Sequence, residues 1–111
     1  MSNHAVFINE SHELRSQLED IGVDAGAYEF LLPKGIFRYV KLKHIPCRAA
    51  HIIKQEMLSK GGEAAIGRQA MEAEGFAFGH TDVLLMGTMK HFRQLTEKLK
   101  RQPFGLRSCK A

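Results

Sequence analysis

Residues 36–62 read IFRYVKLKHIPCRAAHIIKQEMLSKGG, and this stretch decides the fold. Along residues 36–45, one set of side chains alternates with another, and the β-branched and aromatic content is typical of a strand. The first set is Ile36, Arg38, Val40 and Leu42, and the second is Phe37, Tyr39, Lys41 and Lys43. Pro46 fits the first position of a helix, where its missing N–H costs nothing. The helix after it carries an apolar stripe at helical spacing, made of Ala49, Ile52, Ile53 and Met57, and Gly61-Gly62 ends it. A strand leading directly into an amphipathic helix predicts an α/β fold.

The rest of the chain extends this alternation. Short apolar runs predict strands at residues 4–8, 28–32, 63–66 and 83–86. Capping residues and helical spacing predict one helix from Ser11 to Gly22 and another that begins after Thr88. We therefore expect an α/β fold (an α+β sandwich) with a small open sheet and helices on one face, in a ferredoxin-like β-α-β-β-α-β arrangement. Residues 67–80 are the least regular, and we interpret them as a possible flexible loop.

Composition bounds the class of protein. The chain has 111 residues, of which 44% are hydrophobic and 25% charged, close to the globular average. This length predicts a single domain over residues 1–111. The longest apolar runs are strand-sized, so we expect no membrane span, and the first residues show no secretory signal. Two distant cysteines, Cys47 and Cys109, imply no disulfide framework, which favours the cytoplasm.

Positive charge is concentrated in the second half of the chain. Residues 1–45 contain five basic and six acidic side chains, whereas residues 46–111 contain eleven basic and six acidic ones. Much of the excess falls on the predicted last helix and on residues 103–111, which we interpret as a C-terminal tail. A basic surface can attract anions or nucleic acid. A solvated helix face explains the same pattern, and we rank nucleic-acid binding last because no stacking motif accompanies the charge.

One group of residues has spacing that suits a metal or a nucleophile. His44, Cys47 and His51 form an H-x2-C-x3-H pattern, and zinc accepts such ligands. A fourth ligand, His80 or Asp82, would have to arrive through the fold. Cys47 beside a helix start could also be nucleophilic, but no third member is evident. We therefore predict ordinary histidines and a structural cysteine, with no metal site and no catalytic residue.

Two predicted strand-to-helix turns could hold an anion on free backbone N–H groups. The candidate ligand-binding residues are Arg48, Arg68, Gly87 and Thr88. Gly87 allows close approach, Thr88 offers a hydroxyl, and either arginine could close over an anion. No Gly-rich phosphate fingerprint is present, so a capped helix after a buried strand is the competing interpretation.

Two further places could form an interface. Phe76 and Phe78 flank Ala77 between two glycines, and exposed aromatic residues often anchor protein contacts, although they can equally pack on their own core. Lys54 and Gln55 lie on the predicted helix beside the apolar stripe. A solvated helix face with a Glu56–Lys60 pair is the preferred explanation of these residues, and a docking face is the alternative.

Several ordered blocks of the sequence belong together: IGVD at 21–24, PK at 33–34, RAAHIIKQEML at 48–58, GGEAA at 61–65, Arg68, TDVLLMGT at 81–88 and QPFGL at 102–106. In this order they resemble the N-terminal extension that precedes the barrel in some bacterial dihydropteroate synthases. His51 stands where that family usually has Asn. The resemblance implies an association with folate biosynthesis.

The resemblance does not extend to the family's catalytic part. The synthase joins 4-aminobenzoate to a pterin pyrophosphate on a (β/α)8 barrel, which needs about 250 residues. The family's Asp-Ser-Phe loop, pterin-binding Asp and Asn, and Lys and Arg-His sites have no matching positions here. We therefore expect a non-catalytic accessory or regulatory domain without a cofactor, acting through contact with a dihydropteroate synthase-like partner or as a homo-oligomer. The alternative is a small-ligand module for an anion or a pterin phosphate.

Overall fold

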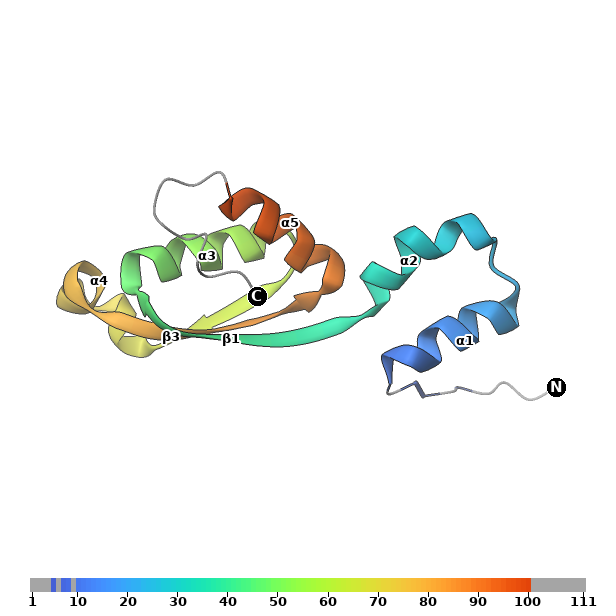
Figure 1. Cartoon of the computed structure of the whole chain (residues 1–111). Coiled ribbons are helices and arrows are strands. Elements are labelled where there is room, and N and C mark those ends of the chain that lie inside the picture. The colour runs from blue at the N-terminus through green and yellow to red at the C-terminus, as the bar shows by residue number, and fades with distance from the viewer. Residues whose placement is uncertain (1–4, 6, 9, 101–111) are drawn as a thin grey trace.

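In the computed structural model, residues 5, 7–8 and 10–100 are placed well enough to describe. Helices α1 (Ser11–Ile21) and α2 (Tyr28–Gly35) come first, joined through a 3-10 turn at Ala25–Ala27. Strand β1 (Phe37–Pro46), helix α3 (Cys47–Ser59) and strand β2 (Glu63–Ile66) follow. A 3-10 turn at Arg68–Met71, helix α4 (Ala73–Phe78), strand β3 (His80–Thr88) and helix α5 (Met89–Leu99) complete the described part. Figure 1 shows this order.

The three strands form one antiparallel sheet in the order β1-β3-β2. Residues 37–42 of β1 pair one for one with residues 83–88 of β3, and a bulge then interrupts the register between Leu42 and Ile45. His44 lies in this bulge with a φ of 54°, which is uncommon for a residue other than glycine. Because β1 and β2 flank β3, the unit β1-α3-β2 is a split β-α-β crossover.

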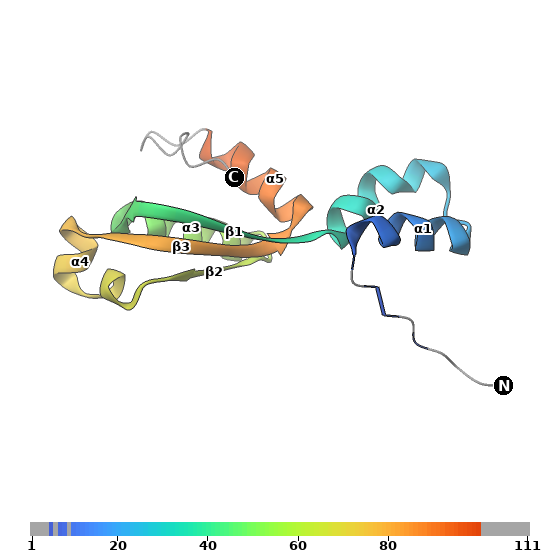
Figure 2. The same ribbon diagram turned by 60° about the horizontal axis from the view of Figure 1, so that its bottom comes forward.

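The core lies between the sheet and two helices. Along β3, Thr81, Val83, Leu85 and Gly87 are buried, whereas the alternate side chains face away from the core. Helix α3 contributes Ile53 and Met57, and α5 contributes Phe92, Leu95 and Leu99. Both helices cover the same face of the sheet and leave the other face open (Figure 2). The predicted mixed α/β fold with a small open sheet and helices on one face is confirmed.

The region that decides the fold behaves as predicted, with one adjustment. Strand β1 and helix α3 follow each other directly, and the buried residues of α3 include Ala49 and Ile53 from the predicted stripe. Pro46 is the last residue of β1 and the N-cap of α3, with a φ of −53°, instead of the first helical residue. Gly61 ends the turn after α3 with a φ of 99°, a conformation that favours glycine.

The strand predicted at residues 28–32 is wrong, because these residues form most of helix α2. A five-residue apolar run cannot be distinguished from a helix segment by periodicity alone. For residues 4–8, the described members Ala5, Phe7 and Ile8 have no strand assignment. In the described residues the sheet therefore has three strands, all from the second part of the chain.

Residues 67–80 form a 3-10 turn and helix α4, where the sequence suggested a possible flexible loop. The glycines permit close packing here. A Cβ at position 75 would collide with the carbonyl oxygen of Gln69, so only glycine lets α4 lie against the preceding turn. The predicted C-terminal tail, 103–111, lies outside the described residues.

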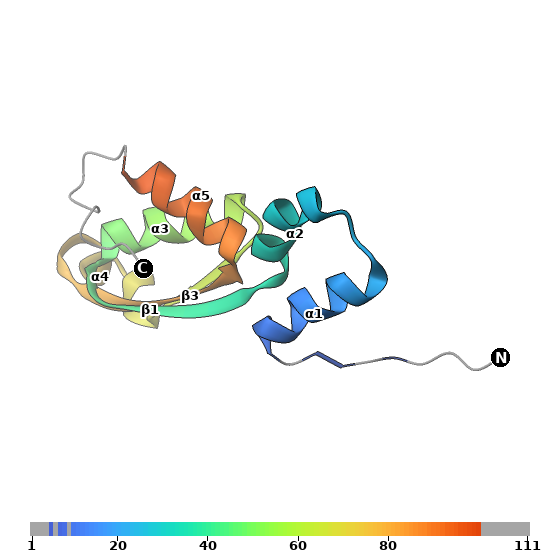
Figure 3. The same cartoon turned by 45° about the vertical axis from the view of Figure 1, so that its right-hand side comes forward.

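Helices α1 and α2 extend away from the sheet as a helical pair (Figure 3). No described side chain in either helix is buried. The pair joins the rest through α2, which contacts α5 and β3, and through the hydrogen bond from Met89 N–H to the carbonyl of Ile36, 2.8 Å long. Across the described residues, no helix combines the length and apolar character needed to cross a membrane.

Candidate functional site

A cavity of about 640 Å³ opens between helix α3 and helix α4. On α3 its lining residues recur at helical spacing, so that Arg48, His51, Ile52 and Gln55 share one face of the helix. Phe76 of α4 closes the opposite side. Pro46 and Ala49 complete the lining. We call this cavity the α3–α4 pocket.

Phe76 organises the α3–α4 pocket. Its ring lies 5.1 Å from the His51 ring in an edge-on contact, and the Arg48 guanidinium carbon lies 5.7 Å from its centroid. His51 is held in place because its Nε2 lies 2.8 Å from the carbonyl oxygen of Ala70, which accepts a hydrogen bond. Phe76 nevertheless remains 41% exposed. An aromatic side chain fixed by two neighbours and still open to solvent suits contact with a partner or a flat ligand.

The structure brings some of the predicted interface residues together. Gln55 and Phe76 line the α3–α4 pocket, together with Arg48 from the predicted ligand set. Lys54 is half-buried on the same helix but is not part of the lining. Phe78, at the end of α4, is 85% exposed and also lies outside the lining.

The predicted anion residues are separated. Arg48 stands at the start of α3, near the His80 end of β3, whereas Gly87 and Thr88 lie at the other end of that nine-residue strand. At about 3.3 Å per residue, the two turns are more than about 20 Å apart. Arg68 is exposed on the 3-10 turn. Whether any of these residues binds a ligand stays a prediction, but they do not form one site.

The turn at Gly87 and Thr88 is occupied by structural contacts. Thr88 Oγ1 accepts a hydrogen bond from the His91 N–H (3.3 Å), and the Thr88 N–H donates to His91 Nδ1 (3.0 Å). This reciprocal capping satisfies two of the N–H groups that an anion would use, and the Met89 N–H donates to the Ile36 carbonyl. A Cβ at position 87 would lie 2.6 Å from the Met57 Cε. Thr88 therefore acts as a helix cap, as the competing interpretation held.

The residues of the H-x2-C-x3-H pattern point to different places. Cys47 is buried in the core, and His51 faces Phe76 and Ala70. His44 instead stacks on His80, with ring centroids 4.0 Å apart. Within the part of the chain that the structure describes, no group of three or more suitable side chains could hold a metal ion. A buried Cys47 is also shielded from a substrate, which favours its structural role.

The fold does bring His80 and Asp82 beside His44, around an opening of about 370 Å³. Asp82 accepts a hydrogen bond from the His44 backbone N–H at 3.0 Å and lies 3.7 Å from Lys41 Nζ. The backbone hydrogen bond, assisted by the charges of Lys41 and Lys43, lowers the pKa of Asp82 below its ordinary value. These contacts hold the β1 bulge in shape.

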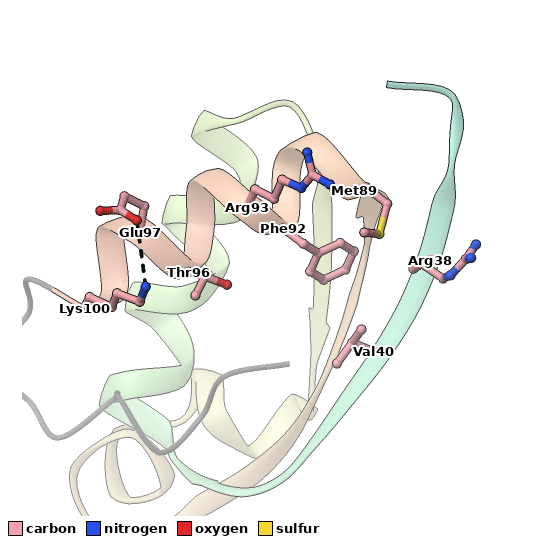
Figure 4. Close-up of a pocket in the computed structure, with 8 residues that line it drawn as sticks. All are labelled: Arg38, Val40, Met89, Phe92, Arg93, Thr96, Glu97 and Lys100. Carbon is pink, nitrogen blue, oxygen red and sulfur yellow. Dashed lines mark ion pairs between the residues drawn. The ribbon is translucent and has the colours of Figure 1, made fainter. Parts of the chain in front are cut away.

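Sequence reasoning missed a second surface, a groove of about 450 Å³ between β1 and α5 (Figure 4). Its lining consists of Arg38, Val40, Met89, Phe92, Arg93, Thr96, Glu97 and Lys100. We call it the β1–α5 groove. The apolar stripe of α5 can be predicted from the sequence. The sequence has no signal that indicates which edge of the sheet this helix lies over.

Comparisons with known proteins give two relatives, while no family model and no solved structure matches the chain. One is the probable bifunctional folylpolyglutamate synthase/dihydropteroate synthase of Halobacterium salinarum, 33% identical over 99 residues, which are 89% of this chain and 12% of the relative. The other is the bifunctional dihydropteroate synthase/dihydropteroate reductase of Helicobacter pylori, 32% identical over 94 residues, 85% of this chain and 24% of the relative. The chain thus spans less than a quarter of either relative. These matches confirm the resemblance: the chain is homologous to one segment of bifunctional proteins that contain dihydropteroate synthase.

Proposed function

We propose that the chain acts as a non-catalytic accessory domain that contacts a dihydropteroate synthase-like partner in folate biosynthesis. The main support for the proposal is that the chain matches only a minor segment of each relative and has a fold different from that of a synthase barrel. The matched segment is 12–24% of each relative, so most of each relative lies outside it. A synthase barrel requires about 250 residues and eight parallel strands. A three-stranded antiparallel sheet cannot be a slice of such a barrel.

The names of the two relatives support the link to the synthase in particular. Both names include dihydropteroate synthase, whereas the second activity differs, being folylpolyglutamate synthase in one and dihydropteroate reductase in the other. A segment shared by both proteins is best associated with the activity that both names share. This argument favours a role beside the synthase.

The α3–α4 pocket is the docking surface that we favour for this contact. Aromatic residues and arginine dominate the binding energy of protein interfaces, especially where they are already fixed before binding. Phe76 and Arg48 meet this description. Gln55 adds a hydrogen-bonding group at the rim.

Co-purification with the barrel-bearing synthase of the same organism tests this function. We expect a complex by light scattering, a changed rate of dihydropteroate formation, and an affinity about tenfold weaker for the Arg48→Ala/Phe76→Leu variant. Phe30→Ala, which removes an aromatic side chain that is 67% exposed on α2, serves as the matched control. Absence of both association and any change in rate would refute the proposal. Self-association of the chain alone would instead indicate a homo-oligomer.

A ligand-binding role is the second candidate, because the α3–α4 pocket pairs a cation with a ring. Arg48 and His51 both contact Phe76. This arrangement suits a flat heterocycle that carries a phosphate, such as a pterin phosphate. A thermal-shift panel of pterins, folates, nucleotides and phosphate tests it, since a ligand raises the melting temperature of the state that binds it. A flat panel, unchanged by Arg48→Ala, would eliminate this candidate.

A further inference from the structure

Strand β1 has an unpaired edge. Among the described residues β1 pairs only with β3, so the backbone groups on its other side have no strand partner. The opposite edge of the sheet is β2, which has only four residues, whereas β1 has ten. A long free edge is a template for another strand, and a short one is not. Six residues of β1, 37–42, precede the bulge and run in regular register.

Helix α5 would cover one face of a strand added at the β1 edge. The β1–α5 groove lies between the core-facing side of β1 and this helix (Figure 4). Val40, Met89 and Phe92 supply its apolar surface. A strand added beside β1 would therefore find a place for its inward side chains.

The charges around the β1 edge are mostly positive. Arg38 and Arg93 line the groove from the strand and the helix respectively. Lys43 is exposed along β1, and so is Lys41, whose ammonium lies 3.7 Å from the Asp82 carboxylate, which offsets its charge. Glu97 also lines the groove, but its carboxylate lies 4.0 Å from the Lys100 ammonium, which offsets its charge. An incoming strand with carboxylates would complement this surface, and one with lysines would be repelled.

We propose that the β1 edge binds an extended acidic segment of another polypeptide, which adds a fourth strand to the sheet beside residues 37–42. Its carboxylates enter the β1–α5 groove beside Arg38 and Arg93. Its alternate, apolar side chains lie on the opposite face, beside the exposed Phe37 and Tyr39. Main-chain hydrogen bonds supply affinity, and the charges supply selectivity, as in other cases of strand addition.

Charge also argues against two other occupants. A second copy of this chain would bring the same Arg38, Lys41 and Lys43 against their counterparts, and edge lysines are a common guard against such self-pairing. Residues 101–111 contain three basic side chains and no acidic one, so they do not complement the edge either. An acidic partner is the occupant that the surface favours.

Peptide binding to the full chain tests this proposal independently of the synthase. The probes are fluorescein-labelled peptides that alternate glutamate with valine, lysine with valine, or glutamate with proline. We expect the glutamate–valine peptide to bind about tenfold or more tightly than the other two, because lysine reverses the charge and proline cannot complete the ladder. When this peptide is added to the isotope-labelled chain, the changes in backbone amide NMR chemical shift should cluster at residues 37–42 and not at Glu63–Ile66.

Variants separate the groove from a general charge effect. Arg38→Glu/Arg93→Glu should weaken the glutamate–valine peptide about tenfold, whereas Lys90→Glu/Lys98→Glu, the same charge change on α5 outside the groove, should have little effect. Equal affinity for all three peptides, no binding at all, or shifts centred on the α3–α4 pocket would overturn the proposal. So would β1 amides that are already protected on both edges in the free monomer, or a dimer joined through β1.

Discussion

The α/β body, residues 36–100, and the helical pair α1–α2 have the same kind of apolar helix pattern but different degrees of burial. Every residue that the structure describes as buried belongs to the body, from Leu42 onward. In the pair, Leu14 and Leu18 are half-buried, and Ile21 and Phe30 are 75% and 67% exposed. An amphipathic stripe therefore predicts a helix, but not that its apolar face is covered within the same chain.

The comparison also concerns stability. Isolated helices of 11 and 8 residues are only marginally stable in water. The stability of α1 and α2 therefore depends on their contacts with each other and on the contacts of α2 with α5 and β3. The helices α3 and α5 are of similar length but are held by the core. We therefore expect the pair to open locally at a lower free energy than the body.

The largest effect is expected from cavities in the body. Ile53→Ala removes a fully buried side chain and should lower the free energy of unfolding by about 2–5 kcal/mol. Leu18→Ala in the pair should cost about 1 kcal/mol or less, because its side chain is only half-buried. Denaturant titration measures both. Equal losses would mean that the pair is as firmly packed as the body.

Glycine replacements sharpen the same contrast. An alanine at Gly87 would place its Cβ 3.0 Å from His91 Nδ1 as well as against Met57, and His91 is held by the α5 cap, so we expect a loss of about 1–3 kcal/mol. An alanine at Gly35 would meet the side chain of Leu14, with Cδ2 nearest at 2.5 Å, and this half-buried side chain can move aside. Gly35→Ala should be neutral or stabilise by about 0.5 kcal/mol in thermal unfolding. A large loss at Gly35 would contradict this view of the pair.

Helix caps should give a smaller difference. Thr88→Ala removes the cap hydrogen bond to His91 and should cost about 1 kcal/mol, with Thr88→Ser restoring most of it. Glu10, the N-cap of α1, makes no side-chain cap bond, so Glu10→Ala should leave the unfolding midpoint unchanged. Chemical denaturation of the three variants checks this prediction. A silent Thr88→Ala would show that His91 alone maintains the start of α5.

The smallest effect should come from acid at the β1 bulge. The His44 N–H lowers the pKa of Asp82 in the folded state, so its carboxylate favours folding above its ordinary pKa of 3.8. That contribution is lost as the pH falls below 3.8 and through the lowered folded pKa. Asp82→Asn should therefore flatten the pH dependence of stability in this range, and a pH series of unfolding curves can test it. Asp24→Asn, an exposed carboxylate in the pair, is the control and should leave the slope unchanged.

The prediction of the candidate site from sequence depended on how far apart its parts lie along the chain. Arg48 and Gln55 could be placed on one helix because their spacing is local. The contact of Arg48 with Phe76 could not be predicted, since it depends on how α4 packs against α3 after β2. For the same reason the sequence does not tell how far the turn at Arg48 lies from the turn at Gly87 and Thr88, which the structure sets at opposite ends of strand β3.

The sequence by itself determined the strands β1, β2 and β3, the helices α3 and α5 with their apolar stripes, and the cap at Thr88, because each of these follows from side-chain periodicity or chemistry within a few residues. Only the tertiary structure decided that residues 28–32 form a helix, that His44 meets His80 and Asp82, and that β1 is left with a free edge below α5. These features arise from pairings between distant segments. Local periodicity contains no information about which distant segment will be the neighbour.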